Sequence, residues 1–301
     1  MRARFAWLIW LLLAACFLAV VGGFAGAVKS VGDSLAVFRL HFAGATVVLA
    51  LALLAIAPRN RHLAALVLAA TLVLAAPTAL SYRSPASAAP PHMLTIYQKN
   101  LNYRSADLDR IADDILAVGA DVVTLQEVSE RNHTLLERLL PNYPHQAYCP
   151  FASVGGTAVL SRLPVDGTAP VCARVGGITA LRVAGPGGPV WAVSLHLRWP
   201  WPQAQAYQAR RLRPVIEGLD APVILGGDLN MVPWGASVAG IARAARAEVV
   251  GPTATTFRLF GGLAPLPIDH VLLPEGWSGA KELRPELGSD HLGVVVRARA
   301  P

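Results

Sequence analysis

The chain has 301 residues, of which 54% are hydrophobic, and a formal net charge of +7 at pH 7. The charge is unevenly spread: residues 1–92 hold seven lysines and arginines and one aspartate, whereas residues 93–301 hold 19 basic and 18 acidic side chains. A protein that binds nucleic acid through charge shows a clustered basic face in its folded domain. The near-neutral remainder argues against that class, and the basic excess belongs to the apolar N-terminal region.

Three apolar runs dominate that region, at residues 5–28, 40–57 and 63–80. Each approaches the roughly 20 residues needed to cross a bilayer, and they contain Gly and Ala freely, as membrane helices do. We therefore expect a membrane anchor of three transmembrane helices over residues 1–80. A removable secretory signal, or lipoprotein cleavage at Cys16, is the alternative, although the apolar character continues past both cleavage points.

Basic residues between and before these runs predict the orientation of the anchor. Arg2 and Arg4 precede the first run, and Arg59 and Arg61 separate the second from the third. Because basic loops stay in the cytoplasm, we expect a multi-pass protein of the inner or plasma membrane whose C-terminal domain is extracytoplasmic (periplasmic). Two basic residues in or near the opposite connection weaken this prediction: Lys29 and Arg39.

Residues 81–92 are rich in Pro, Ser and Ala, have no periodicity, and are interpreted as a linker. Residues 93–301 are enough for one domain with its own core. Cys149 and Cys172 lie in that domain. An oxidising compartment permits a disulfide between them, and two buried free thiols are the alternative.

Alternation and apolar runs predict the strands of this domain, and helical spacing predicts its helices. Strands at 94–102 and 121–128 are each followed by a helix, the first capped by Ser105 and the second running from Ser129 to Leu140. A third helix is expected at 203–219. Further strands are expected at 145–151, 156–162, 170–175, 178–184, 190–197, 222–230, 267–273 and 291–300. Many strands with a few interspersed helices predict an α+β fold of packed sheets.

The strand at 222–230 ends in two glycines followed by Asp228 and Asn230. Side chains two residues apart share one face of a strand, so an acceptor and a donor point together and suit a water and a phosphate oxygen. The same sequence is also common in plain turns. Polar side chains recur at the ends of other predicted strands: Asn100, Gln126, Glu127, His196, Asp269, His270, Ser289, Asp290 and His291. Their convergence at one edge of the packed sheets predicts a single site.

Seven segments carry a family resemblance: KNLN, DVVTLQEV, GTAVLSR, SLHL, GGDLN, IDHVLL and GSDHLGVVV, in this order between residues 94 and 297. Together they resemble the endonuclease/exonuclease/phosphatase superfamily with the deoxyribonuclease-I-like fold. The resemblance implies a four-layered α/β/β/α sandwich and divalent-metal-dependent cleavage of a phosphate ester. It also implies a metal site in which Glu127 is the principal ligand, with Asn100 and Asp290 near the ion. Such oxygen ligands suit Mg²⁺, with Mn²⁺ as a substitute.

The same resemblance implies catalytic roles for five further residues. Asp228 and Asn230 hold the attacking water and the phosphate, and Asp269 orients His291. His196 contacts the phosphate or assists the leaving group. Either Asp228 or His291 takes the proton of the water.

Two departures from the family pattern qualify these roles. No acidic residue lies between Tyr148 and Thr157, where nuclease members place a carboxylate that orients the first histidine. This weakens the expectation that His196 is a strong acid. His270 stands where several members have tyrosine, and we expect it to be structural.

The loop after His196 carries the residues that bear on the substrate. Trp199 and Trp201, each followed by proline, are able to stack on a nucleobase, lie at a membrane interface or pack on the sheet. Three arginines are candidates for a second phosphate or a lipid headgroup, or are simply solvated: Arg198, Arg210 and Arg211.

The sequence therefore predicts a membrane-anchored phosphoesterase that acts outside the cytoplasm on a phosphate ester, lipid-linked or other. The alternatives are an anchored extracytoplasmic nuclease that acts on DNA or RNA, and a non-catalytic binding module. The expected partners are the lipid bilayer and the phosphoester substrate, with no protein partner predicted.

Overall fold

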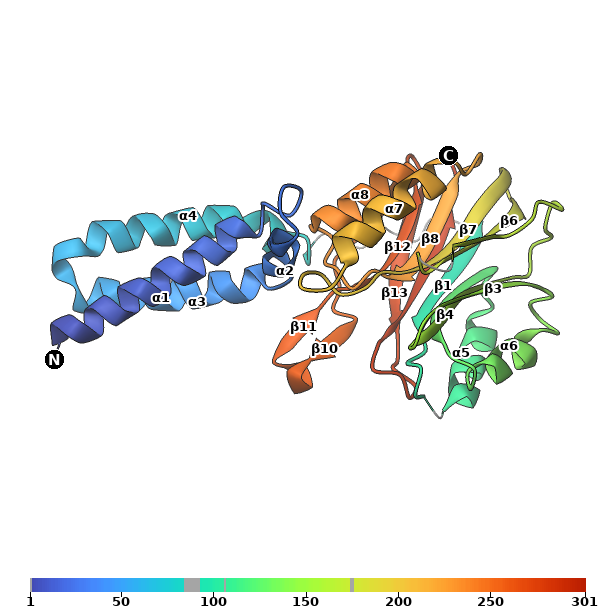
Figure 1. Cartoon of the computed structure of the whole chain (residues 1–301), viewed down its shortest axis with the longest axis horizontal. Helices are drawn as coiled ribbons and strands as arrows, with labels where there is room; N and C mark the ends of the chain where they lie inside the picture. Colours follow the sequence, from blue (N-terminus) through green and yellow to red (C-terminus); the bar gives the residue numbers. More distant parts are fainter. Residues whose placement is uncertain (1, 84–92, 106, 174–175) are drawn as a thin grey trace.

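The computed structural model describes residues 2–83, 93–105, 107–173 and 176–301. It has two parts (Figure 1): a long, narrow helical part formed by the N-terminal residues and a broader α/β domain that contains the C-terminus. Residues 84–92, which make up most of the expected linker, lie outside the described residues. The division into anchor, linker and domain therefore stays a prediction.

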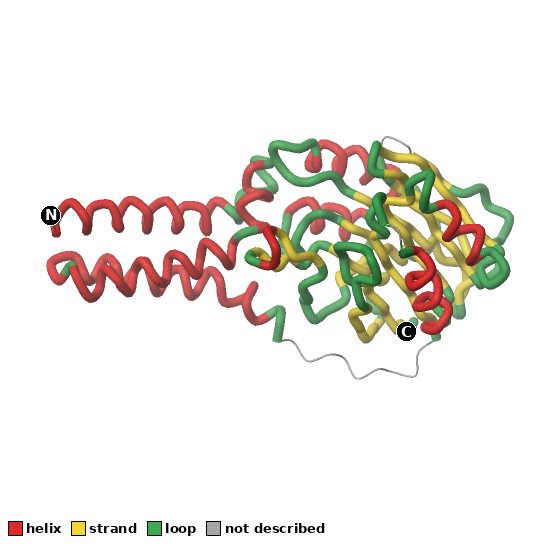
Figure 2. The backbone as a smooth tube through the Cα atoms, turned by 90° about the horizontal axis from the view of Figure 1, so that it is seen from below, coloured by secondary structure: helices red, strands yellow, loops and turns green. Residues whose placement is uncertain are grey.

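Three long helices form the narrow part: α1 (Arg2–Gly22), α3 (Arg39–Ile56) and α4 (Arg61–Leu80), the last two joined by the turn η1 (Pro58–Asn60). They run side by side (Figure 2) around a small apolar core that includes Leu13 and Leu53. Large apolar side chains also cover the outside of the bundle, where Val48 is 66% and Val73 72% exposed. A helix that is apolar all round belongs in an apolar environment.

The lengths of these helices differ from the expected membrane spans. By length and composition α3 and α4 are able to cross a membrane, whereas the apolar stretch of the first helix, Ala6–Gly22, is shorter. The expected first span continued to residue 28, but α1 ends at Gly22 and turns follow. Gly22 and Gly23 explain the end, because glycine is the weakest helix former after proline. Three transmembrane helices are thus not established by length and composition.

Two six-stranded sheets form the core of the α/β domain. The first has the strand order β13-β14-β1-β2-β4-β3. Its strands are β1 (Leu94–Asn100), β2 (Val122–Val128), β3 (His145–Ala152), β4 (Gly155–Ser161), β13 (Ser278–Arg284) and β14 (Gly293–Arg299). Parallel pairing of β1 with β2 places the C-terminal ends of these two strands at the same edge.

The second sheet has the order β5-β6-β7-β8-β12-β9, and a hairpin of β10 and β11 stands outside both sheets. Its strands are β5 (Val171–Ala173), β6 (Ile178–Gly185), β7 (Gly188–His196), β8 (Val223–Asp228), β9 (Ala247–Val249) and β12 (Asp269–Pro274). The hairpin consists of β10 (Phe257–Leu259), the turn η2 (Phe260–Gly262) and β11 (Ala264–Leu266).

Helices cover the outer faces of both sheets (Figure 1). On the first sheet lie α5 (Leu108–Val118) and α6 (His133–Leu139), which share an apolar cluster with β1 and β2. On the second sheet lie α7 (Gln205–Glu217) and α8 (Ala236–Ala245), packed through residues such as Leu212 and Ile241. A third apolar cluster, which includes Ile96 and Ile224, joins the inner faces of the sheets. These layers form the expected α/β/β/α sandwich.

Two helix starts differ from expectation. The helix α5 begins at Leu108, and Ser105 accepts a bond from the Asp107 N–H at 3.4 Å in the turn before it. The helix α6 begins at His133, because the Ser129 hydroxyl donates to the Tyr103 carbonyl at 3.0 Å and does not cap a helix. Local hydrogen bonds of serine thus compete with the capping role that the sequence predicted.

Several elements had no counterpart among the expected ones, among them α2 (Val31–Val37), β9 and the hairpin of β10 and β11, and the two longest in the domain are α8 and β13. The helix α8 consists largely of small residues, ASVAGIARAA, so few large apolar side chains mark its buried face. The strand β13 lies at the edge of its sheet, and nearly all of its side chains are partly exposed. Its sequence, SGAKELR, therefore does not alternate between apolar and polar residues. Tertiary contacts rather than local pattern define both elements.

Cys149 of β3 and Cys172 of β5 form a disulfide. This decides between the two alternatives that the sequence left open. Since β3 and β5 are edge strands of different sheets, the bond links the two sheets at one side of the sandwich. Its contribution to stability comes mainly from restricting the unfolded chain.

The short helix α2 (Val31–Val37) joins the helical part to the domain. Its Asp33 accepts bonds from the Ala236 N–H at 2.7 Å and the Ser237 N–H at 3.1 Å, at the start of α8. Ala36 and Val37 are buried in the apolar cluster that α7 and α8 form with the second sheet. The two parts are therefore joined by packed and hydrogen-bonded contacts as well as by the chain itself.

Replacing both disulfide cysteines, Cys149→Ala with Cys172→Ala, is expected to lower the free energy of unfolding by about 3 kcal/mol, the chain-entropy value for a loop of this length. Chemical denaturation of the full chain in detergent, with and without a reductant, measures the effect. Reductant is expected to destabilise the unmodified protein but not the double variant. Cys16→Ala is the control, since Cys16 forms no disulfide, and an equal loss from that variant would contradict the prediction.

Candidate active site

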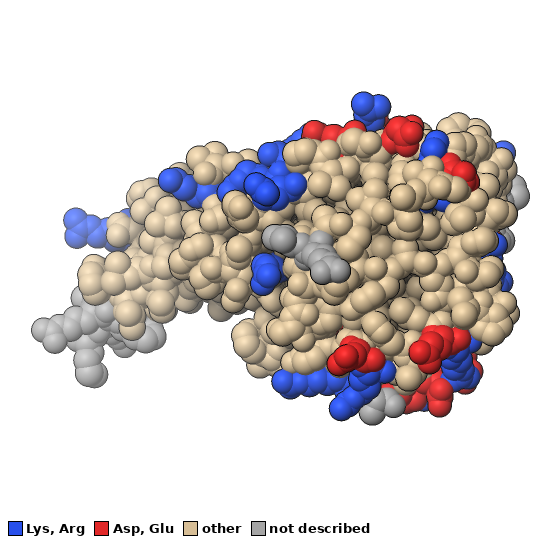
Figure 3. Space-filling model, turned by 45° about the vertical axis from the view of Figure 1, so that its right-hand side comes forward, with Lys and Arg blue, Asp and Glu red and all other residues tan. Residues whose placement is uncertain are grey.

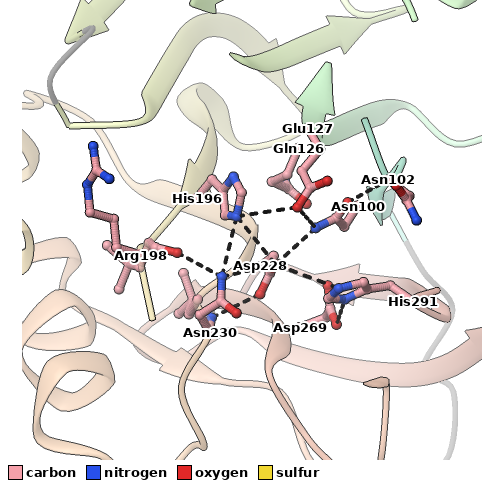
Figure 4. A network of polar contacts seen from close by, with 12 residues as sticks. Asn100, Asn102, Gln126, Glu127, His196, Arg198, Asp228, Asn230, Asp269 and His291 are labelled. Atoms are coloured by element: carbon pink, nitrogen blue, oxygen red, sulfur yellow. Dashed lines mark hydrogen bonds and ion pairs between the residues drawn. The ribbon is translucent and has the colours of Figure 1, made fainter. Parts of the chain in front are cut away.

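Strand ends from both sheets meet at one edge of the sandwich (Figure 4). In the second sheet, His196 at the end of β7 pairs with Asp228 at the end of β8, and Asp269 at the start of β12 lies opposite Asp228 on its other side. In the first sheet, Asn100 ends β1 beside Gln126 of β2. The packing of the two sheets brings these ends together, as the strand-end pattern predicted.

Asp228 lies at the centre of this group (Figure 4). Its carboxylate accepts bonds from the Asn100 amide at 2.9 Å and from the Asn230 N–H at 2.9 Å. Two histidines approach the same carboxylate, with His196 Nε2 at 3.5 Å and His291 Nε2 at 3.9 Å. Burial raises the pKa of Asp228 well above its usual range, because an apolar interior disfavours the charged form.

Glu127 reaches the site through an irregularity in β2. Its φ is +55°, in the left-handed region, and the register of β2 with β4 shifts between Gln126 and Val128. Such a bulge redirects a side chain at the end of a strand, at a cost in backbone strain. The carboxylate accepts bonds from the Tyr103 N–H at 2.9 Å and the Asn100 amide at 3.2 Å. Burial raises the pKa of Glu127 despite these bonds.

His291 and Asp269 form a buried pair in which Nδ1 of the histidine lies 2.8 Å from the carboxylate. Burial alone would lower the pKa of His291, but the carboxylates of Asp269 and Asp228 outweigh it and raise the pKa. Burial likewise opposes the charge of Asp269, yet His291 holds the pKa of Asp269 below its usual value. The hydrogen bond between Nδ1 and the Asp269 carboxylate fixes the orientation of the His291 ring, so that Nε2 faces Asp228.

His196 faces the same group through Nε2, which lies 4.0 Å from Glu127 and 3.4 Å from the Asn230 amide. Its Nδ1 is buried and has no hydrogen-bond partner among the described residues. Phe151 packs against the ring instead, with the centroids 5.8 Å apart. Burial lowers the pKa of His196 to about 4, so the ring is neutral at pH 7. The sequence has no acidic residue between Tyr148 and Thr157 to orient this histidine, and Nδ1 of His196 accordingly has no partner among the described residues.

Asn230 is the second residue of the site with a positive φ, +45°. Its amide donates to the Leu197 carbonyl at 2.8 Å and to Asp228 at 3.3 Å, so it is fixed beside the carboxylate. His270, expected to be structural, contacts the Met231 carbonyl at 2.7 Å and supports the loop that follows Asn230. Both sides of this loop are therefore held by hydrogen bonds.

A cavity of about 270 Å³ opens over these side chains. Glu127, His196, Asp228, Asn230 and His291 line it, together with Asp290, which is exposed. Four residues close its rim with aromatic and basic groups: Phe151, Arg198, Trp199 and Phe257. The site is thus an open pocket lined by carboxylates, with aromatic and basic side chains at its rim.

Lys99 is a supporting residue that the sequence did not single out. It is fully buried, and its ammonium donates to the carbonyls of Pro285 at 3.0 Å, Glu286 at 2.8 Å and His291 at 2.6 Å. These bonds hold the loop that carries Asp290 and His291. The signal was a polar run, QKN, at the end of a strand that is otherwise apolar.

Gln98 and Gln126 connect the two sheets behind the site. Gln98 donates to Asp269 at 3.0 Å and to Gln126 at 2.8 Å, and Gln126 donates to Ser194 at 2.9 Å. The network pairs the side-chain nitrogens of both glutamines between the sheets, where an unpaired group is costly, and leaves Gln98 Oε1 without a partner among the described residues. It also fixes Asp269 relative to the first sheet. Pairing across sheets is a property of the fold that local sequence pattern does not reveal.

The residues present fit a bound divalent cation. Ligand atoms of Glu127, His196 and Asp228 lie within 4.8 Å of one another, and so do those of Asp228, Asp269 and His291. Among the described residues, neither Glu127 nor Asp228 pairs with a lysine or arginine. The pKa values of these two neighbouring carboxylates are raised, and a bound cation would compensate their negative charge.

The Asn100 amide donates to both carboxylates, and its oxygen accepts the Asn102 N–H at 2.8 Å. In this orientation Asn100 bridges Glu127 and Asp228 as a donor. Contact of its oxygen with a cation would require the amide to turn. Of the three expected metal-site residues, Glu127 and Asn100 are in direct contact, and Asp290 lies at the rim of the same cavity.

Several solved structures share this fold. The chain is similar to the endonuclease/exonuclease/phosphatase from Bacteroides vulgatus, with a TM-score of 0.58 and 15% identity over 69% of this chain and 99% of that one. It is similar to D. rerio TDP2 complexed with a single-strand DNA product, with a TM-score of 0.54 and 18% identity over 69% and 99% of the two chains. A mutant of beta toxin from Staphylococcus aureus with bound magnesium ions gives 0.51 and 14% over 68% and 99%.

At these identities the similarity establishes the fold and not the substrate. No curated protein sequence matches the chain. A family model, described as the Endonuclease/Exonuclease/phosphatase family, matches residues 97–291. This match covers more than half of the chain and contains every site residue described above, from Asn100 to His291. The chain therefore belongs to the endonuclease/exonuclease/phosphatase family.

Proposed function

We propose that this protein is a divalent-metal-dependent phosphoesterase held in a membrane. The observation that carries the proposal is the pair of carboxylates, Glu127 and Asp228, which face one cavity next to the His291–Asp269 pair. A structural neighbour holds magnesium and another holds a single-strand DNA product. Both observations support metal-assisted chemistry on a phosphate ester for this chain.

Glu127, Asn100 and Asp290 would hold the cation, for which we propose Mg²⁺ with Mn²⁺ as a substitute. When bound, the cation supplies Lewis-acid stabilisation of charge on the phosphoryl oxygen. The chain itself keeps Glu127 aimed into the cavity through the bulge in β2 and the Tyr103 N–H. Lys99 supports the opposite side by holding the loop of Asp290.

Asp228 and His291 would position the attacking water, and one of the two would take its proton. Nε2 of His291 lies 3.9 Å from the Asp228 carboxylate, so one water beside the two atoms would be within reach of both. Asp269 keeps His291 in a single orientation through the bond to Nδ1. Asn230, fixed by the Leu197 carbonyl, would donate to a phosphate oxygen. His196, neutral and without a partner at Nδ1, would contact the phosphate through Nε2 rather than act as a strong acid.

The position of the pocket favours a substrate at a membrane surface. The loop that carries Arg198 and Trp199 on the pocket rim continues to Trp201, whose carbonyl accepts a bond from Ser34 of α2 at 2.6 Å. The rim of the site is thereby connected to the segment between the first two long helices. A lipid-linked phosphate ester at the membrane surface would lie next to this rim. Unlike a nucleic acid, it needs no broad basic groove for binding. We therefore place a lipid-linked phosphoester before nucleic acid.

The anchor and the disulfide support the compartment and topology that we propose. The apolar exterior of the helical bundle supports membrane insertion, and the Cys149–Cys172 bond supports an oxidising compartment for the domain. The turn between α3 and α4 lies at the end of the bundle far from the domain (Figure 1). Because Arg59 is in this turn and Arg61 begins α4, a cytoplasmic position of the turn is supported. We propose a multi-pass protein of the inner or plasma membrane with an extracytoplasmic domain.

The substrate test uses the full chain in proteoliposomes with Mg²⁺, because α2 contributes to the domain core. A lipid-linked phosphate monoester and plasmid DNA are offered in parallel. We expect release of phosphate from the lipid and intact DNA, and no release from an Asp228→Ala, His291→Ala double variant. Cleavage of DNA that the double variant lacks would instead make the protein an anchored nuclease.

Glu127→Gln is expected to lower Mg²⁺-stimulated turnover by at least about a hundredfold, the scale on which a lost charge-stabilising partner acts. Calorimetric titration with Mg²⁺ should show a matching loss of affinity. Glu130→Gln is the matched control, because Glu130 is an exposed acidic residue three positions away. Full turnover and unchanged Mg²⁺ affinity in Glu127→Gln would remove Glu127 from the metal site.

Asp228→Ala and His291→Ala are expected to be strongly non-additive. Because the two side chains act on one water, each single change should lower kcat by about 10² to 10⁴. The double change should cost little more than the more severe single change, since groups that act as a unit lose their effect together. A double-variant loss equal to the product of the two single losses would mean that the residues act independently.

Orientation is tested in a Cys16→Ala background, where the remaining cysteines form the disulfide. Arg299→Cys should react with a membrane-impermeant maleimide on intact cells, and Arg59→Cys only after permeabilisation. The reverse pattern would contradict the proposed topology. The mass of the purified chain is measured alongside, and loss of the residues before Val28 or Cys16 would reveal a cleaved signal in place of the first helix.

A further inference from the structure

A second cavity, of about 160 Å³, lies where the helical part meets the domain. Its lining includes the loop after α1 and the facing sides of α7 and α8. Small residues make much of its wall, among them Gly26, Ala209 and Gly240, and three arginines line it: Arg210, Arg213 and Arg243. None of these residues lines the active-site cavity.

The three arginines form a local excess of positive charge. Arg210 and Arg213 lie one turn apart on α7, and Arg243 is on the neighbouring helix α8. None of the three forms an ion pair with any acidic side chain that the structure describes. A group of basic side chains is visible at this boundary in Figure 3. Like charges one turn apart are unfavourable without a counter-charge, so the cluster calls for an anion.

One acidic residue, Asp33, also lines this cavity. Its carboxylate is buried and already accepts three bonds, from the Ala236 N–H, the Ser237 N–H and the Ser237 hydroxyl. Asp33 therefore serves α8 and leaves the three guanidinium groups free to take another anion. With one negative and three positive side chains, the lining keeps a net positive charge.

The surroundings of the cavity indicate where the anion comes from. The segment between α1 and α2 supplies Gly26 and Ala27 to the lining and exposes Phe24 at 50% and Val28 at 79%, and Val31 at the start of α2 is 40% exposed. Exposed apolar side chains next to a membrane helix are placed to enter the lipid interface. The arginines then stand at the level of the lipid headgroups. Neither the free phosphate of solution nor a soluble polyanion accounts for this apolar border.

We propose that this cavity binds the phosphate headgroup of an acidic phospholipid from the membrane that holds the helices. Guanidinium groups bind phosphate through paired hydrogen bonds, and basic side chains near a surface are attracted to anionic lipid. The inference rests on the membrane placement in the proposed function and is independent of its catalytic part. Arg210 thereby has a role among the three arginines considered from sequence, whereas Arg211 does not line the cavity and Arg198 belongs to the active site.

The test measures binding of dihexanoyl phosphatidylglycerol and dihexanoyl phosphatidylcholine to the full chain in a non-ionic detergent, at fixed ionic strength. We expect saturable binding of phosphatidylglycerol only. Arg213→Gln and Arg243→Gln should each weaken it about fivefold, the effect of one basic side chain at an anionic surface. Arg211→Gln is the matched control, with the same loss of charge on the same helix and no expected change.

A second variant tests the cavity without changing its charge. A Cβ at Gly240 would have Arg213 Cδ at 3.7 Å as its nearest neighbour, so Gly240→Leu places its longer side chain in the cavity. It should weaken phosphatidylglycerol binding while thermal unfolding stays cooperative. If Gly240→Leu melts without cooperativity, the decision rests on the two arginine variants alone.

Three results would overturn the inference: equal binding of the two lipids, an equal loss in Arg211→Gln, or inorganic phosphate bound as tightly as phosphatidylglycerol. The last would make the cavity a free-anion site. Hydrolysis does not enter the measurement. Failure of lipid binding with intact phosphoesterase activity would therefore reject this inference alone, and lipid binding by a protein without activity would reject the catalytic proposal alone.

Discussion

Two carboxylates held opposite each other in neighbouring strands constrain the whole domain. Asp228 ends β8 and Asp269 begins β12, directly across the ladder, and both are buried. Like charges in such a pair repel, and burial adds the cost of desolvation. His291 relieves the conflict because it bonds to Asp269 and faces Asp228. The remaining supports follow from this arrangement: Gln98 binds Asp269 from the other sheet, and Lys99 fixes the loop that delivers His291.

Much of this site was predictable from sequence, because strands place their last residues at an edge. Asn100, His196, Asp228 and Asp269 were each marked by a polar side chain at the end of an apolar run, and all four lie within one group of contacts. Alternation and short apolar runs also identified the core strands that carry them. The α/β/β/α layers came from the family resemblance, and the observed sheets and outer helices agree with it.

What local pattern missed depends on long-range contacts. The bulge that turns Glu127 into the cavity, with φ at +55°, is invisible in an apolar run ending in Gln-Glu. The roles of Lys99 and Gln98 require partners more than 150 positions away. The pairing of Cys149 with Cys172 depends on how the edges of two sheets meet. The buried face of α8 consists mostly of small residues, and α1 ends earlier than its apolar run.

The contact between α2 and α8 has a consequence for biosynthesis. The cap of α8 is Asp33, which lies 203 positions earlier in the chain than the Ala236 N–H that it binds. A side chain at the start of a helix stabilises it by about 1 kcal/mol, and α8 has no capping side chain of its own. Since chains grow from the N-terminus, the cap is synthesised and placed long before the helix that needs it. The start of α8 therefore depends on the earlier folding of the N-terminal helices, which place α2 and its Asp33 against the domain.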